Sequence, residues 1–116
     1  MERYVNDFIK YSIMNCDSAH NGDYKKANYA NDKLRKIEKA LVELGEAEKF
    51  IDEIIYTVED QRVLGWICSY AIEINYNLPR MEKILKNIIR TSKTLDAFEA
   101  EIMLKIIANK KKKEKN

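Results

Sequence analysis

The sequence is poor in residues that interrupt helices. Its 116 residues contain one proline, Pro79, and three glycines. Gly22 and Gly45 stand where the apolar periodicity breaks, and Gly65 lies inside an apolar segment. No stretch alternates apolar and polar residues as a half-buried strand does. We therefore expect an all-α protein.

Long apolar runs are also missing. No segment approaches the roughly 18 apolar residues of a membrane-spanning helix. The opening residues, "MERYVNDFIK", place Glu2, Arg3 and Asp7 where a secretory signal peptide requires an unbroken apolar region. We therefore expect a cytoplasmic protein.

Cysteine and histidine are too scarce to build a reactive site. Cys16 and Cys68 lack CxxC spacing, and we expect two reduced, buried thiols. His20 is the single histidine, whereas a structural zinc site needs four good ligands. Three scattered glycines cannot form a phosphate-binding loop. We expect no metal, no cofactor, no small-molecule substrate and no catalytic residue, and therefore no enzyme.

Six segments carry apolar residues at intervals of three and four, the spacing of amphipathic helices. They predict helices over 3–19, 24–44, 46–57 and 61–76, a fifth that opens at Pro79, and a sixth that Thr94 caps. Asp23 and Asp60 are expected N-caps, and Gly45 is expected to close the second helix. The residues expected to face the core are Tyr4, Val5, Phe8, Ser12, Ala27, Ala30, Leu34, Ile37, Leu41, Leu44, Ala47, Phe50, Ile51, Ile54, Ile55, Val63, Ile67, Tyr70, Ala71, Ile74, Met81, Ile84, Leu85, Ile88, Leu95, Phe98, Ile102 and Ile106.

Short links between these segments predict that successive helices pack as antiparallel hairpins. Three such hairpins would form one domain over residues 1–109, a short HEAT-like α-solenoid. A compact helical bundle is the alternative. Residues 110–116, "KKKKEKN", are expected to be a disordered lysine-rich tail.

Charge is distributed unevenly along the chain. The whole chain carries +2, but its last seven residues hold five Lys and one Glu, which leaves 16 basic and 18 acidic residues in 1–109. Between Glu43 and Asp60, seven acids stand against Lys49. This acidic segment is either a solvated helix surface or a docking surface for a basic partner.

The segment "VLGWICSYAIEINY", residues 63–76, contains the chain's single Trp. On a helical wheel Val63, Ile67, Ala71 and Ile74 share one side, and Trp66, Tyr70 and Glu73 form a ridge on its flank. Large aromatic residues either pack in a core or anchor an interface. The candidate partner-binding residues are Glu46, Glu48, Asp52, Glu53, Glu59, Asp60, Trp66, Tyr70 and Glu73.

Three parts of the chain resemble, in order and spacing, a family of small bacterial HEAT-like proteins known only as a domain of unknown function. The resemblance rests on "GDYKKANYANDKLRKI" (22–37), "VLGWICSYAIEIN" (63–75), and "MEKILKNI" with "FEAEIMLK" (81–88 and 98–105). It implies a helical-repeat fold, with relatives among immunity proteins that neutralise toxins of interbacterial competition.

These observations predict a non-enzymatic protein-binding module, an immunity protein that covers a basic toxin domain, such as a nuclease. The alternative is a small nucleic-acid- or membrane-associated adaptor that acts through Lys110–Lys115.

Overall fold

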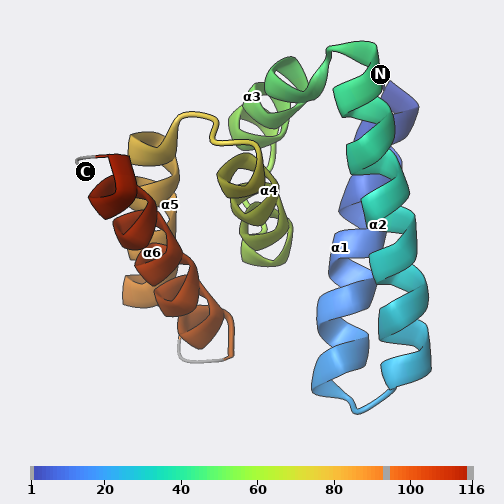
Figure 1. Ribbon diagram of the computed structural model, residues 1–116. Coiled ribbons are helices and arrows are strands. Elements are labelled where there is room, and N and C mark those ends of the chain that lie inside the picture. Colours follow the sequence, from blue (N-terminus) through green and yellow to red (C-terminus); the bar gives the residue numbers. More distant parts are fainter. Residues whose placement is uncertain (1, 93–94, 115–116) are drawn as a thin grey trace. The chain divides into compact units, whose positions relative to one another are not determined.

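The computed structural model of the chain describes residues 2–92 and 95–114. Within these residues it contains six helices and no strand, which confirms the all-α prediction (Figure 1). The helices are α1 (Glu2–His20), α2 (Tyr24–Leu44), α3 (Ala47–Thr57), α4 (Gln61–Glu73), α5 (Leu78–Thr91) and α6 (Leu95–Glu114). Each predicted helix is therefore present, while Thr94, the predicted cap of the last one, lies outside the described residues.

The chain divides into two compact units, Met1–Val63 and Leu64–Asn116. One domain over 1–109 stays a prediction. The division falls inside α4, the fourth predicted helix. In a chain of short helical hairpins most contacts join neighbouring helices, so the interior splits into local clusters. The middle hairpin that the sequence predicted would consist of α3 and α4, and the division falls within its second helix.

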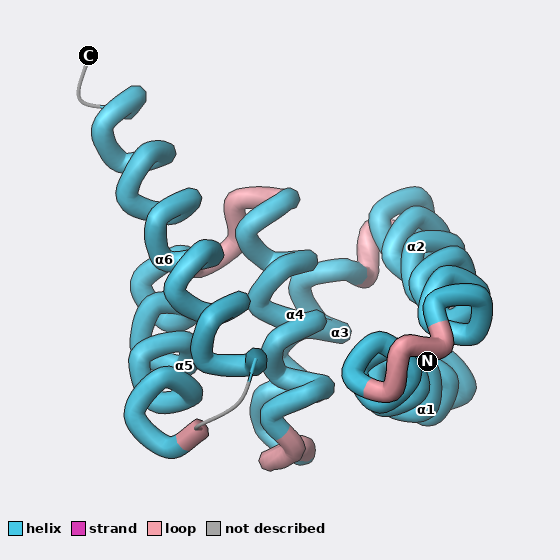
Figure 2. Tube along the Cα trace, turned by 90° about the horizontal axis from the view of Figure 1, so that it is seen from below, coloured by secondary structure: helices cyan, strands magenta, loops and turns pink. Residues whose placement is uncertain are grey.

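The first unit is organised around the antiparallel pair α1 and α2 (Figures 1 and 2). The small buried residues Ala27 and Ala30 allow the two helices to approach closely, and Asn15 Nδ2 donates to the Ala27 carbonyl oxygen at 2.9 Å. The ring of Phe8 on α1 meets that of Phe50 on α3 edge to face, with centroids 5.3 Å apart. Both rings are fully buried, so this contact ties α3 to the hairpin.

Left-handed residues end three of the helices. Gly22 and Gly45 adopt φ of 78° and 71°, and Asn75 adopts 58°. After Gly45, the Glu46 N–H donates to the Leu41 carbonyl at 2.9 Å, which satisfies an orphan carbonyl of α2. The prediction for Gly45 is confirmed. The fourth helix ends at Glu73, earlier than predicted, because the chain turns at Asn75.

N-caps begin two of the helices as predicted. Asp23 accepts the Lys26 N–H at 3.1 Å at the start of α2. Asp60 accepts the Arg62 N–H at 2.9 Å at the start of α4. Pro79 occupies the first turn of α5, where its missing N–H costs little.

The second unit contains the antiparallel hairpin α5 and α6, together with most of α4. Its core is formed by buried side chains from all three helices, namely Ile67, Cys68, Tyr70, Ala71, Met81, Leu85, Ile88, Ala100 and Ile107. Burial raises the pKa of the Cys68 thiol to about 12. Neither cysteine forms a disulfide, and Cys16 is half-buried rather than buried as predicted.

The sequence predicted the wrong side of α6 as its buried side. Phe98, Ile102 and Ile106 are 60%, 44% and 42% exposed, whereas Ala100 and Ile107 are fully buried. Helix α6 carries apolar residues on two sides. Phe98, Ile102 and Ile106 lie on one side, and Ala100 and Ile107 lie on another, and both spacings are typical of a buried helix face. Periodicity alone could not choose between them. Leu95, also predicted inward, has a side chain outside the described part.

The prediction of a disordered tail over 110–116 is wrong for residues 110–114, which continue α6. Lys110 Nζ donates to Asn75 Oδ1 at 2.7 Å, and Lys111 forms an ion pair with Glu82. Lysines in the last turn also interact favourably with the negative end of the helix dipole. These contacts explain why a lysine run remains helical.

Most of the other predicted core residues are buried. The prediction that Leu44 faces the core is wrong, because its side chain is 61% exposed at the last position of α2. The half-buried members of the set are Tyr4, Val5, Ile55, Ile74 and Ile84.

Two glycines offer a matched stability test. A Cβ placed on Gly45 or on Gly65 would meet no atom within 4 Å, so the backbone decides the outcome in both cases. Gly45→Ala should lower the free energy of unfolding by about 1 kcal/mol, because its φ is left-handed. Gly65→Ala, inside α4, should raise it by about 1 kcal/mol. Urea denaturation followed by circular dichroism measures both, and a loss of stability in Gly65→Ala would contradict this account.

Candidate protein-binding surfaces

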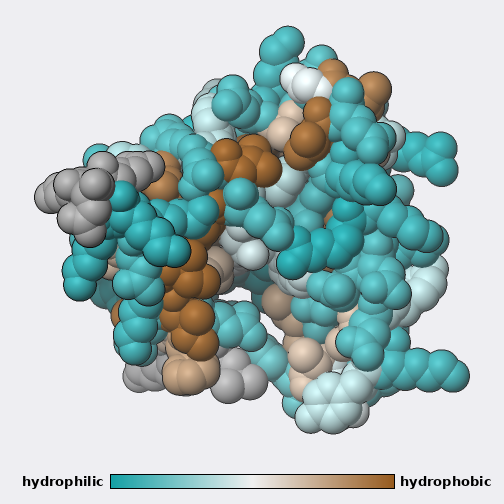
Figure 3. Space-filling model, in the orientation of Figure 1, coloured by the Kyte–Doolittle hydropathy of each residue, from teal (hydrophilic) through white to brown (hydrophobic). Residues whose placement is uncertain are grey.

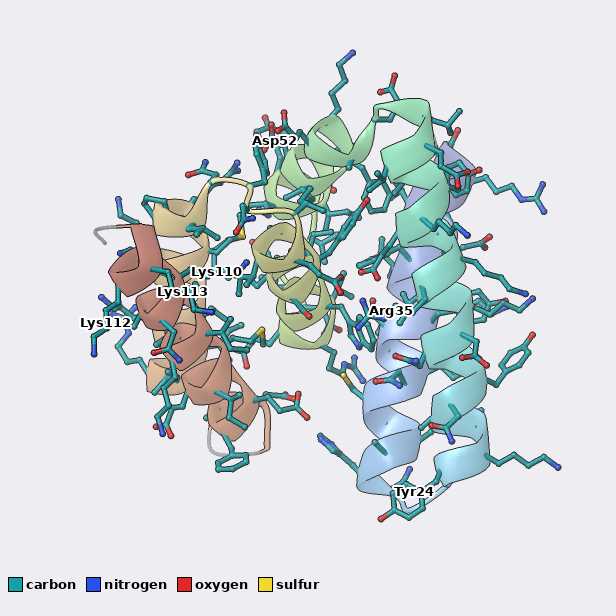
Figure 4. The ribbon with its side chains drawn as sticks, in the orientation of Figure 1. Tyr24, Arg35, Asp52, Lys110, Lys112 and Lys113 are labelled. Carbon is teal, nitrogen blue, oxygen red and sulfur yellow. The ribbon has the colours of Figure 1, made fainter. Side chains whose placement is uncertain are left out.

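The outer side of α3 forms an acidic face. We define it by Glu48, Lys49, Asp52, Glu53 and Tyr56, which lie within one side of the helical wheel. The opposite side of the same helix carries the buried residues Ala47, Phe50, Ile51 and Ile54. The packing of α3 against its own unit therefore fixes which way the acids point, and Figure 4 labels Asp52 on this helix.

Tyr56 is the residue on this face that sequence reasoning missed. It is 89% exposed, the highest value among the large hydrophobic residues whose side chains the structure describes. It follows Asp52 by four residues and Glu53 by three, so it shares the helix surface with both carboxylates. A tyrosine combines a large apolar ring with a polar tip, and it is enriched among residues that dominate binding energy. Its position at the polar edge of the α3 helical wheel is the feature of the sequence that indicates its exposure.

Asp60, predicted to bind a partner, is already engaged within its unit. Arg62 donates through Nη2 to Asp60 Oδ2 at 2.7 Å and through Nε to Asp60 Oδ1 at 3.0 Å. Arg62 Nη1 also donates to both carboxylate oxygens of Asp17, at 2.9 and 3.0 Å. These hydrogen bonds with Arg62 lower the pKa of Asp60, and those with Asp60 and then Asp17 raise the pKa of Arg62.

The remaining predicted acids differ in exposure. Glu48, Glu53 and Glu59 are exposed, and Glu46 and Asp52 are half-buried. Glu48 lies in the first turn of α3, where its charge also favours the helix dipole. The carboxylates of Glu48 and Glu53 on α3 therefore face solvent. The negative charge of Asp60, at the C-terminal end of the predicted cluster, is neutralised by Arg62.

The predicted ridge on α4 is split by burial. Tyr70 is 1% exposed, so its assignment to a partner-binding surface is corrected to the core of the second unit. Trp66 is half-buried and Glu73 is exposed. Tyr70 was expected both in the core and on the ridge, and the structure places it with Ile67 and Ala71 on the buried side.

A pocket of about 300 Å³ lies between α4 and α6 in the second unit. It is lined by Ser69, Ile72, Glu73, Met103, Ile106 and Lys110. Glu73 is thereby placed beside residues of α6, whereas Trp66 does not line this pocket. The lining is mostly aliphatic, with one acid and one base at its edge.

The lysine run at the end of α6 projects in several directions, and Figure 4 labels Lys110, Lys112 and Lys113 there. Lys110 and Lys111 contact Asn75 and Glu82 of the same unit. The adaptor alternative therefore depends chiefly on the lysines beyond these two.

The described residues include no group of three or more His, Cys, Asp or Glu side chains that could hold a metal ion. Across the same part of the chain, no helix has the length and apolar character needed to cross a membrane. Comparisons with protein-family models, with curated proteins and with solved structures find no match. The family resemblance stays a prediction.

Two substitutions separate the contribution of the Asp60–Arg62 ion pair to stability from that of the N-cap hydrogen bond. Asp60→Asn keeps a cap oxygen for the Arg62 N–H but removes the charge, and Asp60→Ala removes both. We expect Asp60→Ala to lower the free energy of unfolding by about 1 kcal/mol, and Asp60→Asn by less.

The pH dependence has a definite sign. The folded-state pKa of Asp60 is lowered, so its charge stabilises the fold above the unfolded pKa of about 3.9, and this contribution is lost as pH falls through the folded value. The stability difference between wild type and Asp60→Asn should shrink below about pH 4. Urea titrations from neutral to acidic pH measure this, and a difference that grows at acidic pH would contradict the assignment.

Proposed function

We propose that the protein is a non-enzymatic protein-binding module whose acidic face on α3 docks a basic partner. The observation that carries the proposal is Tyr56, 89% exposed on the same helix surface as Asp52 and Glu53. A tyrosine beside carboxylates on one helix surface combines apolar area with charge, as residues that anchor an interface do.

Charge and ring have separate roles in this proposal. Carboxylates steer a basic partner and speed its encounter, an effect that weakens as salt rises. The tyrosine ring then supplies buried apolar area and a hydroxyl at the centre of the contact. Because α3 is held by Phe50 and its neighbours, the surface is preorganised and little ordering is needed on binding.

The specific function we propose is that of an immunity protein, which binds a basic toxin domain of an interbacterial competition system and covers its active site or substrate groove. A nuclease suits this description, because a protein that binds nucleic acid presents a cationic groove. The acidic face matches such a groove in charge. Support from the sequence is the resemblance to the HEAT-like family described above.

The test begins with capture of a partner. The tagged chain is used to capture proteins from the cells that produce it, at low and moderate salt. A captured protein is then expressed alone and together with the tagged chain, and growth is measured. Rescue of growth supports the immunity function. A stoichiometric partner that is harmless when expressed alone would refute the immunity function while leaving the docking surface in place.

Variants on the acidic face distinguish its two components. Tyr56→Ala should weaken binding of the captured partner by about 2 kcal/mol, chiefly by faster dissociation. Glu48→Gln with Glu53→Gln should slow association and reduce its dependence on salt. Surface plasmon resonance at several salt concentrations separates the rates. Tyr24→Ala is the matched control, since Tyr24 is 69% exposed at the start of α2.

Equal loss of binding in Tyr24→Ala and Tyr56→Ala would show that any exposed tyrosine matters, and would refute the assignment to α3. Circular dichroism of each variant shows whether the fold is intact. Binding that survives all the α3 variants would place the contact elsewhere.

A further inference from the structure

The exposed apolar stripe of α6 belongs to no function described so far. We define the stripe by Phe98, Ile102 and Ile106, which follow one another at four-residue intervals. The stripe continues on one side into the pocket between α4 and α6, because Ile106 lines that pocket together with Met103. Figure 3 shows hydrophobic side chains gathered along α6. Three large apolar residues in line on one helix are unusual for a surface that stays in water.

The charges beside the stripe change sign along the helix. Asp96, Glu99 and Glu101 lie in its N-terminal half, and Lys105 begins a C-terminal half that contains Lys110–Lys113 and ends at Glu114. Acids thus lie near the Phe98 end of the stripe, and Lys105 and Lys110 lie near its Ile106 end. A helix with this polarity is complementary to a copy of itself running in the opposite direction, whereas a parallel copy would oppose like charges.

We propose that α6 pairs with α6 of a second copy of this chain, antiparallel, about a two-fold axis that passes close to Ile102. This surface is distinct from the acidic face on α3 and does not depend on the proposed function. With the axis at this residue, Ile102 packs against Ile102 of the second copy, and Phe98 packs toward its Ile106. The stripe is then covered by an identical stripe, as a two-fold interface requires.

The same register pairs the flanking charges. Glu101 and Lys105, both exposed, lie on one side of the stripe, so Glu101 approaches Lys105 of the second copy. The antiparallel arrangement also sets the two helix dipoles in opposite directions, which is favourable.

The first measurement is the molar mass of the purified chain by sedimentation velocity over a wide concentration range. A monomer has a mass of 13.7 kDa, and we expect the mass to approach twice this value as concentration rises. A mass that stays at the monomer value throughout would overturn the proposal. High salt should weaken the dimer, because the flanking charge pairs are exposed.

Ile102→Glu places two carboxylates next to the two-fold axis and should weaken the dimer by about a hundredfold or more. The control is Leu44→Glu, since Leu44 is also a largely exposed apolar residue but lies on α2. It should leave the dimer unchanged. If circular dichroism shows that Ile102→Glu unfolds the monomer, the stripe is covered within the chain and the proposal fails.

A charge-swap pair tests the register independently of Ile102→Glu. Glu101→Lys alone and Lys105→Glu alone each oppose like charges across the axis, and each should dimerise at least about tenfold more weakly than wild type. Mixing the two variants restores opposite charges at both contacts, so a heterodimer should form in the mixture. A pairing of residues 101 and 105 within one helix cannot produce this rescue. Failure of the mixture to associate would overturn the antiparallel register.

Discussion

The left-handed turns that close α1, α2 and α4 are the constraint on which the rest of the fold depends. At Gly22, Gly45 and Asn75 the backbone reverses within one or two residues and satisfies the carbonyls that a helix end leaves open. At Gly22 the next helix begins at once, because Asp23 caps α2. The hairpin of α1 and α2 follows from this turn, and the direction in which α3 leaves the hairpin follows from the turn at Gly45.

The parts of the fold that the sequence predicted well are those with one physical solution. Helix α2 carries a single apolar stripe, with Ala30, Leu34 and Leu41 fully buried as expected, and its polar residues leave no other side for the core. Turn residues such as Gly45 and caps such as Asp60 are equally local, since a left-handed backbone favours glycine and an open helix end requires an acceptor.

The sequence could not predict which side of a helix is buried where two sides are apolar, because contacts with neighbouring helices decide between them. Helix α6 is apolar on two sides, and only the contacts with its neighbours select Ala100 and Ile107 rather than Phe98 and Ile102 as its buried set. Tyr70 borders two faces of α4 and is drawn into the core by the same kind of choice. Tyr56 and Trp66 each lie at the edge of a helical apolar arc, where spacing does not distinguish an exposed ring from a packed one. Side-chain exposure, rather than composition, distinguishes the two.

The helical state of the lysine run changes what kind of polycation the chain presents. A disordered lysine segment can turn all its ammonium groups toward an anionic surface, but successive residues of a helix point about 100° apart. Lys110, Lys112 and Lys113 therefore occupy fixed and different directions around α6, and Lys111 is directed to Glu82. A flat polyanion can neutralise only those lysines on the side that it touches. The number of counterions released on such a contact is thus set by helix geometry and not by the lysine count.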